Sequence, residues 1–135
     1  MNGLKYLAIF LTIVLCAGFA SCSSNDDDAP SELIGTWYMT HSEGYERDDT
    51  VDETWNETYT GNDGGVFIFY NDGKFKHDDT ECTWKYKDGI ITINYPNETA
   101  TIRVLKISSS ELILERSEKE EDYEYYDKMT FKKAN

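Results

Sequence analysis

The chain of 135 residues carries 26 acidic and 13 basic side chains, which gives a formal net charge of −13 at pH 7. This excess of negative charge opposes binding to nucleic acid and to anionic lipid headgroups. Once an apolar N-terminal run and an acidic stretch are set aside, about 100 residues remain, which is the size of one small domain.

The N-terminal segment has the pattern of a secretory signal peptide. Its one charge, Lys5, precedes the apolar run 6–19. That run is shorter than the roughly 20 residues that a membrane-spanning helix needs. Two small residues then precede Cys22, a pattern that resembles the lipobox of bacterial lipoproteins. The resemblance implies that residues 1–21 are removed as a lipoprotein signal peptide and that the thiol of Cys22 receives a diacylglyceryl group.

Residues 22–32 are expected to be the lipidated cysteine and a flexible acidic tether. The three consecutive aspartates 26–28 repel one another and favour disorder. The resemblance implies two or three acyl chains, and two or more anchor a protein stably in a membrane. The acidic run also resembles the export signal that directs lipoproteins to the cell surface in one group of Gram-negative bacteria. We therefore expect an outer-membrane, surface-exposed protein. An inward-facing position and an ordinary secreted protein cut near Ala20 are the alternatives.

The segment 33–133 predicts short strands and no helix. Alternation of apolar and polar residues, clearest over 82–86, indicates strands with one buried face. Turn residues at 71–73 and 87–89 predict tight hairpins. The polar stretch 42–52 predicts the longest loop of the domain, and 117–122 a second charged connection. Strands are expected over 33–39, 53–60, 66–70, around Phe75, and over 82–86, 90–95, 99–107, 111–116 and 123–132.

Eight or nine strands at this spacing favour a closed up-and-down barrel or a sandwich, and closure removes exposed sheet edges. Five motifs carry a resemblance to the lipocalin-like domains of bacterial lipoproteins: Leu33-Ile34-Gly35-Thr36-Trp37, the stretch 67–75, Thr83-Trp84-Lys85-Tyr86, the stretch 110–114 and the stretch 129–133. The resemblance implies an all-β fold over 33–133, a small antiparallel barrel of about eight strands after the signal peptide and tether. It brings no catalytic or ligand-contact motif with it.

The interior of such a barrel is expected to be mostly filled, with a shallow mouth. An eight-stranded barrel is just wide enough to be filled by side chains or to hold one small ligand. Each inward-pointing aromatic residue brings roughly 150–250 Å² of buried surface. Seven aromatic residues are expected to point inward: Trp37, Phe67, Phe69, Phe75, Trp84, Tyr95 and Phe131.

A second group of aromatic residues is a candidate ligand site at the barrel mouth. These residues occur among many acids and could stack on a sugar or a planar apolar ligand; core packing is the alternative. The group comprises Trp55, Tyr59, Tyr123, Tyr125 and Tyr126, and the ligand-binding candidates taken from it are Trp55, Tyr59, Tyr123 and Tyr125. Separately, Thr50 lies in a three-residue stretch that resembles an O-glycosylation acceptor of the same bacterial group.

Catalytic chemistry is not indicated. The two histidines, His41 and His77, have no nucleophile pattern beside them, and two histidines do not make the usual three-ligand catalytic zinc site. We expect Cys82 to be a buried, inert thiol. The sequence therefore predicts no catalytic residue, no metal and no cofactor, although an enzyme that uses scattered carboxylates stays as a third hypothesis.

The sequence thus predicts an exported, membrane-anchored lipocalin-like lipoprotein that is not an enzyme. In the first hypothesis it binds a small apolar or sugar ligand at the barrel mouth. In the alternative, a filled barrel serves as a protein-interaction or accessory module of a cell-envelope complex.

Overall fold

A computed structural model describes residues 29–134 of the chain. The expected signal peptide, Cys22 and most of the tether lie outside the described residues. A short 3-10 turn, Ser31–Leu33, leads into nine strands within the described range: β1 (Gly35–Asp48), β2 (Asp52–Thr58), β3 (Val66–Phe69), β4 (Lys74–His77), β5 (Thr80–Lys87), β6 (Ile90–Asn94), β7 (Thr99–Ile107), β8 (Glu111–Glu120) and β9 (Tyr123–Lys133). Within 29–134 no helix has the length and apolar character to cross a membrane.

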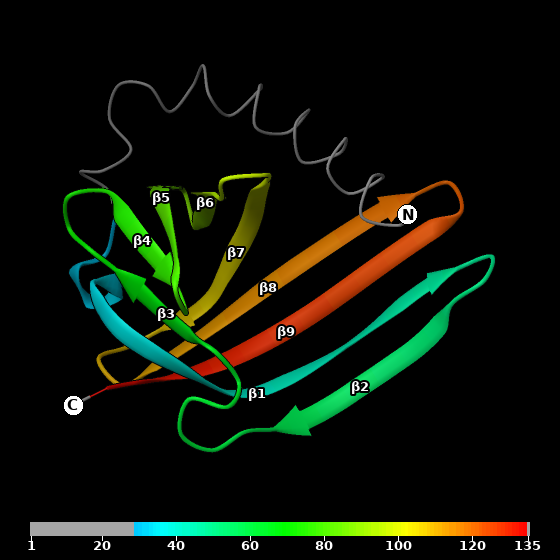
Figure 1. Ribbon diagram of the computed structural model, residues 1–135, viewed down its shortest axis with the longest axis horizontal. Coiled ribbons are helices and arrows are strands. Elements are labelled where there is room, and N and C mark those ends of the chain that lie inside the picture. Colours follow the sequence, from blue (N-terminus) through cyan, green and yellow to red (C-terminus); the bar gives the residue numbers. More distant parts are fainter. Residues whose placement is uncertain (1–28, 135) are drawn as a thin grey trace.

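Eight of these strands close an antiparallel barrel (Figure 1). The first half of β1 pairs with β3 on one side and with the end of β9 on the other, which completes the ring. β2 stays outside the ring and pairs with β1. The predicted all-β, lipocalin-like barrel is therefore confirmed, with one additional strand beside it.

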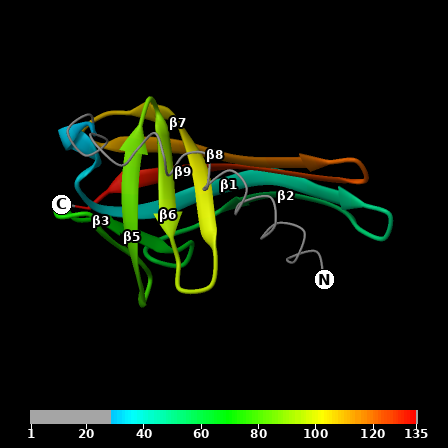
Figure 2. The ribbon, with the colours of Figure 1, turned by 90° about the horizontal axis from the view of Figure 1, so that it is seen from above.

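A four-stranded sheet projects from the barrel, and we call it the arm. It consists of residues 41–48 of β1, all of β2, residues 116–120 of β8 and residues 123–128 of β9, in the order β2-β1-β9-β8. Seen from above in Figure 2, these strands continue well past β5, β6 and β7. The arm begins on β1 at a register shift between Met39 and His41 in the pairing with β9.

The arm corrects two of the sequence-based expectations. The predicted loop 42–52 is wrong, because 42–48 belong to β1 and the β1–β2 turn spans 49–51. The predicted connection 117–122 is also wrong, because β8 continues to Glu120. Both stretches are polar on both faces, so the apolar alternation that marks a half-buried strand is missing. Backbone pairing with β9 makes strands of them nevertheless.

The barrel interior is filled by side chains, as predicted. Six of the seven expected aromatic residues are buried, and Tyr95 is half-buried. The indole Nε1 of Trp37 donates a hydrogen bond to the carbonyl oxygen of Leu33 at 3.0 Å, which ties the 3-10 turn to the barrel. The ring centroids of Phe67 and Phe131 lie 4.8 Å apart within the interior. A ligand buried inside the barrel would have to displace this core.

Two smaller expectations concern the hairpin turn at Gly73 and the burial of the Cys82 thiol. Gly73 has a φ of +91°, which the predicted hairpin turn requires of glycine. Cys82 is buried as predicted, and burial raises the pKa of its thiol.

Candidate ligand site on the arm

One face of the arm continues the barrel interior, and we call it the inner face. Paired residues of neighbouring antiparallel strands point to the same side of a sheet. Three rows therefore follow one another away from the barrel core, each read from β2 to β8: Glu57, Ser42, Met129 and Leu114; then Trp55, Gly44, Asp127 and Arg116; then Glu53, Glu46, Tyr125 and Glu118.

The middle row is held together by the carboxylate of Asp127. The indole Nε1 of Trp55 donates a hydrogen bond to Asp127 Oδ1 at 3.0 Å. The buried hydroxyl of Ser42 donates to the same oxygen at 2.8 Å. Trp55 and Asp127 lie on β2 and β9, so their hydrogen bond spans β1 at Gly44. This bond fixes the indole against the sheet.

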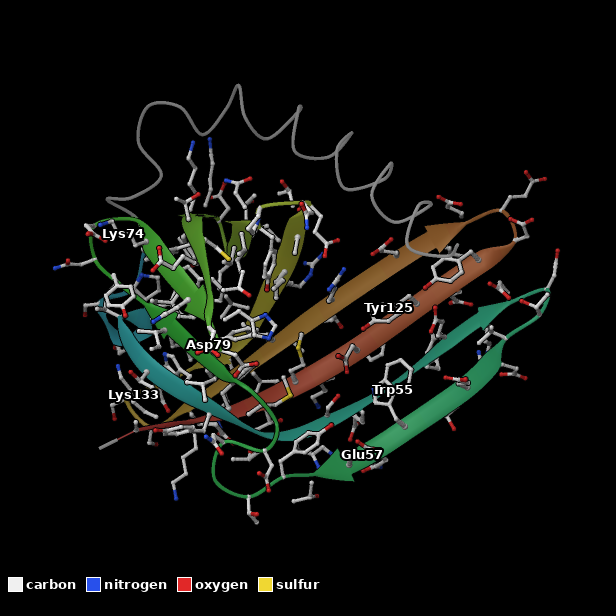
Figure 3. The ribbon with its side chains drawn as sticks, viewed as in Figure 1. Trp55, Glu57, Lys74, Asp79, Tyr125 and Lys133 are labelled. Carbon is white, nitrogen blue, oxygen red and sulfur yellow. The ribbon has the colours of Figure 1, made fainter. Side chains whose placement is uncertain are left out.

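Trp55 and Tyr125 form an aromatic pair on this face. Their ring centroids are 5.8 Å apart with an interplanar angle of 46°. Figure 3 shows both side chains on the same side of the arm, rising from β2 and β9. The guanidinium carbon of Arg116 lies 5.7 Å from the centroid of the Tyr125 ring. Both aromatic residues are half-buried, so part of their surface is open to a ligand.

The other two predicted aromatic residues flank this pair. The Tyr59 hydroxyl donates to Glu57 Oε1 at 2.9 Å, and its pKa is raised by burial and by this carboxylate. Tyr123 lies two residues before Tyr125 on β9, and its hydroxyl donates to Glu46 Oε2 at 3.1 Å. The structure thus places Trp55, Tyr59 and Tyr125 around Asp127, and Tyr123 towards the tip of the arm.

Sequence reasoning did not find four polar residues of this face: Ser42, Arg116, Glu118 and Asp127. Glu118 is 5% exposed, and neither of its carboxylate oxygens accepts a hydrogen bond from the described residues. Its shortest charge contact is with Arg116 Nη2 at 3.8 Å. Burial raises the pKa of Glu118 to about 7, and Arg116 opposes this rise. Residues 116–120 are all polar, so no alternating pattern in the sequence could have indicated that β8 extends to Glu120.

The two histidines lie apart from each other, and neither lies on the inner face of the arm. His77 lies at the barrel mouth, where its Nδ1 is 2.8 Å from the Tyr95 hydroxyl, and burial lowers its pKa. His41 lies on the opposite face of the arm, with Nε2 3.2 Å from Glu43 Oε1. Among residues 29–134 no group of three or more His, Cys, Asp or Glu side chains could hold a metal ion.

Thr50 lies exposed in the β1–β2 turn at the tip of the arm. Its hydroxyl donates to Asp48 Oδ1 at 3.0 Å, and its backbone N–H donates to the same oxygen at 2.7 Å.

The comparison with protein families is decisive for the fold. A family model described as a lipocalin-like domain matches residues 33–114, more than half of the chain. The chain belongs to the lipocalin-like domain family. The matched segment ends before the outer half of β8 and before β9, so Arg116, Glu118 and Asp127 lie beyond it.

No curated protein matches the chain. Among solved structures, a deswapped triple mutant of the bovine odorant-binding protein is similar to it. The identity is 17%, the similarity covers 77% of this chain and 75% of that chain, and the TM-score is 0.39.

The two faces of the arm in this lipocalin-like protein differ in charge. The inner face carries seven carboxylates and one basic side chain, Arg116; the acids are Glu46, Asp48, Glu53, Glu57, Glu118, Glu120 and Asp127. The opposite, outer face mixes both signs along the same strands, with Arg47, Lys119 and Lys128 among Glu43, Glu115 and Glu124. The outer face also has an aromatic pair, Tyr45 and Tyr126, whose ring centroids lie 5.8 Å apart. Tyr126 is expected from the sequence with the other aromatic residues of the mouth, but strand alternation places it on the opposite face from Tyr125.

A separate open pocket of about 700 Å³ lies over β4, β5 and the end of β6. Tyr70, Lys74, Lys76, Thr83 and Tyr95 are among its lining residues. None of the four predicted ligand residues lines it.

Proposed function

We propose that this protein is a non-catalytic binding protein whose ligand, a small molecule with an apolar or sugar-like surface, lies on the inner face of the arm. The observation that carries this proposal is the half-buried Trp55–Tyr125 pair beside the filled barrel. Because the core occupies the barrel interior, the ligand contacts the mouth and the arm and does not enter the barrel. The barrel then acts as a rigid support for the arm.

The chemistry of the face supports binding more than catalysis. Aromatic rings offer apolar contact area, and a few fixed polar groups orient a ligand. Asp127 is engaged by Ser42 and Trp55, which suits a positioning role in the site. We therefore assign the ligand contacts to Trp55, Tyr59 and Tyr125. Tyr123 is buried and bonded to Glu46, so it closes the distal end of the site.

Tryptophan fluorescence tests this site directly. Of the three tryptophans, Trp37 and Trp84 are buried in the barrel, so Trp55 is the one that a ligand on the arm can reach. The full chain is extracted in detergent, and native mass spectrometry detects any retained ligand. That ligand, added back, should quench or shift the Trp55 signal, and Trp55→Ala should abolish the response.

A matched control comes from the outer face. Tyr126→Ala removes one ring of the Tyr45–Tyr126 pair from the same sheet. It should leave ligand binding unchanged, whereas Tyr125→Ala should weaken it. Equal loss of binding in both variants would show that the ligand does not lie on the inner face.

We further propose that lipid at Cys22 anchors the protein in the outer membrane, exposed at the cell surface, and that Thr50 carries a glycan. Replacing Cys22 by Ala should move the protein from the membrane to the soluble fraction. A variant that still sediments with membranes would contradict the anchor. The mass of the mature chain tests the glycan, because Thr50→Ala should remove any added sugar mass.

Docking to an envelope protein is a second candidate function, favoured by the open edges of the arm. β2 pairs with β1, and residues 116–120 of β8 pair with β9, and the described pairings leave one side of each segment open. Such edges can accept a partner strand. Crosslinking in intact cells would then capture one partner through β2 or β8, and a proline at Asn56 would reduce the yield.

A further inference from the structure

The inner face of the arm combines aromatic rings with an unbalanced negative charge. We infer that the ligand of this face is a small organic cation, an amine with an apolar body, that places its nitrogen near Glu118 and its apolar part on Trp55 and Tyr125. This inference rests on the proposed function and names the chemical class of the ligand.

The charge balance of the face is the first argument. Seven carboxylates and one guanidinium leave a local excess of negative charge where the two rings lie. A neutral ligand that covered this face would exclude water from its carboxylates without supplying a donor to Glu118, which is unfavourable. A cation offsets that cost through Coulomb attraction, and the ring faces attract it as well.

The second argument is the state of the Glu118 side chain. It is 95% buried, and neither oxygen accepts a hydrogen bond from the described part of the chain. The nearest basic atom, Arg116 Nη2, is 3.8 Å away, beyond hydrogen-bond distance. Glu118 pairs in register with Tyr125, so it lies beside the aromatic pair. A ligand ammonium group would supply N–H donors to this carboxylate, and such charge-assisted bonds are the strong ones.

The outer face offers the internal comparison. It carries a stacked tyrosine pair of the same spacing, and Arg47 lies 4.3 Å over the Tyr45 ring. On the inner face Arg116 is farther from the Tyr125 ring, at 5.7 Å. Basic and acidic side chains alternate along its strands. Aromatic rings alone therefore do not predict an amine site; the rings together with Glu118 do.

Benzylamine and benzyl alcohol are a suitable probe pair, because they share the ring and size while the amine is charged at pH 8. Each is titrated into the full chain in detergent at low salt, with Trp55 fluorescence and calorimetry as readouts. We expect benzylamine to bind at least about tenfold more tightly than benzyl alcohol. Equal affinity for the two would overturn the inference while leaving the proposed binding function intact.

Variants of the inner face test where the nitrogen of the bound amine lies. Glu118→Gln keeps the shape of the side chain and should reduce benzylamine affinity about tenfold, with little effect on benzyl alcohol. Trp55→Phe retains a ring and should keep most of the benzylamine affinity measured by calorimetry. Tyr126→Ala, on the outer face, should leave the benzylamine affinity unchanged. Unchanged benzylamine affinity in Glu118→Gln would refute the placement of the nitrogen.

Three further outcomes distinguish failure of this inference from failure of the proposed function. Tight binding of a tetralysine peptide without any binding of benzylamine would replace the small amine with a basic protein segment as the partner. If neither benzylamine nor benzyl alcohol binds and the ligand retained in native mass spectrometry is neutral, the inference fails and the proposed function stands. If no ligand of any kind depends on Trp55 or Tyr125, both fail.

Discussion

The barrel and the arm share three long strands, yet different interactions stabilise them. On β9 the inward side chains change from Phe131 and Met129 in the barrel to Asp127 and Tyr125 in the arm. On β8 they change from Leu114 to Arg116 at the same boundary. The hydrogen-bonded ladder continues across this boundary, but the apolar core does not. Backbone pairing therefore extends the sheet beyond its core, and the extension carries polar and aromatic side chains on the face that is apolar in the barrel.

The largest expected difference between the two regions is in stability. Phe131→Ala empties part of the closed core and should lower the free energy of unfolding by about 3–5 kcal/mol. Tyr125→Ala removes a half-buried ring on the arm and should cost about 1 kcal/mol. Urea denaturation followed by circular dichroism measures both. Equal losses would mean that the arm is part of the cooperative core.

Within the arm, we expect a substitution at Gly44 to have the largest effect on stability. A Cβ at this position would collide with the backbone carbonyl oxygen of Tyr126, so β1 and β9 would have to separate locally. We expect Gly44→Ala to cost about 1–3 kcal/mol and to speed amide hydrogen exchange in the arm while barrel amides stay protected. Asn56→Ala, exposed on β2, is the control and should have little effect. Unchanged exchange in Gly44→Ala would refute the close approach.

Glu118 makes the stability of the protein depend on pH. Its folded pKa of about 7 lies above the ordinary value of 4.5, so the native state binds this proton more tightly than the unfolded chain. Its contribution is therefore most favourable below pH 4.5 and is lost as the pH rises to about 7. The charged neighbours that shift this pKa are Arg116, Glu120 and Glu98.

Glu118→Gln should accordingly stabilise the protein at pH 8 by about 1–2 kcal/mol and change little at pH 4. Thermal unfolding at the two pH values measures the difference. A variant that is less stable than the parent at pH 8 would show that the charged carboxylate is a favourable partner in the fold.

The smallest effect is expected on the outer face. Tyr126→Ala removes one ring of an aromatic pair and should cost about 0.5–1.5 kcal/mol without loss of ligand affinity. The same urea titration, combined with the calorimetric titration, measures both quantities. A large loss of affinity would show that the two faces of the arm do not differ in function.

The candidate site could be predicted in part. Aromatic residues in an acidic context indicated Trp55, Tyr59, Tyr123 and Tyr125, because such residue types suit stacking wherever they lie. Their polar neighbours could not be found in this way. Asp127 meets Trp55 through the register of β2, β1 and β9, and their distance along the chain is 72 residues. No local pattern encodes such a contact.

The residue pattern was enough to predict an all-β domain, because burial of one strand face leaves an alternating apolar pattern along the chain. That pattern allowed a barrel or a sandwich, and the resemblance to lipocalin-like domains favoured the barrel. The residue pattern also predicted the hairpin turns and the aromatic filling of the interior. The strands at 42–48 and 117–120, and the inner face that joins Trp55, Asp127 and Glu118, could be seen only in the folded structure. These segments bury no continuous core, so their conformation depends on the backbone of the neighbouring strand and not on their own side chains.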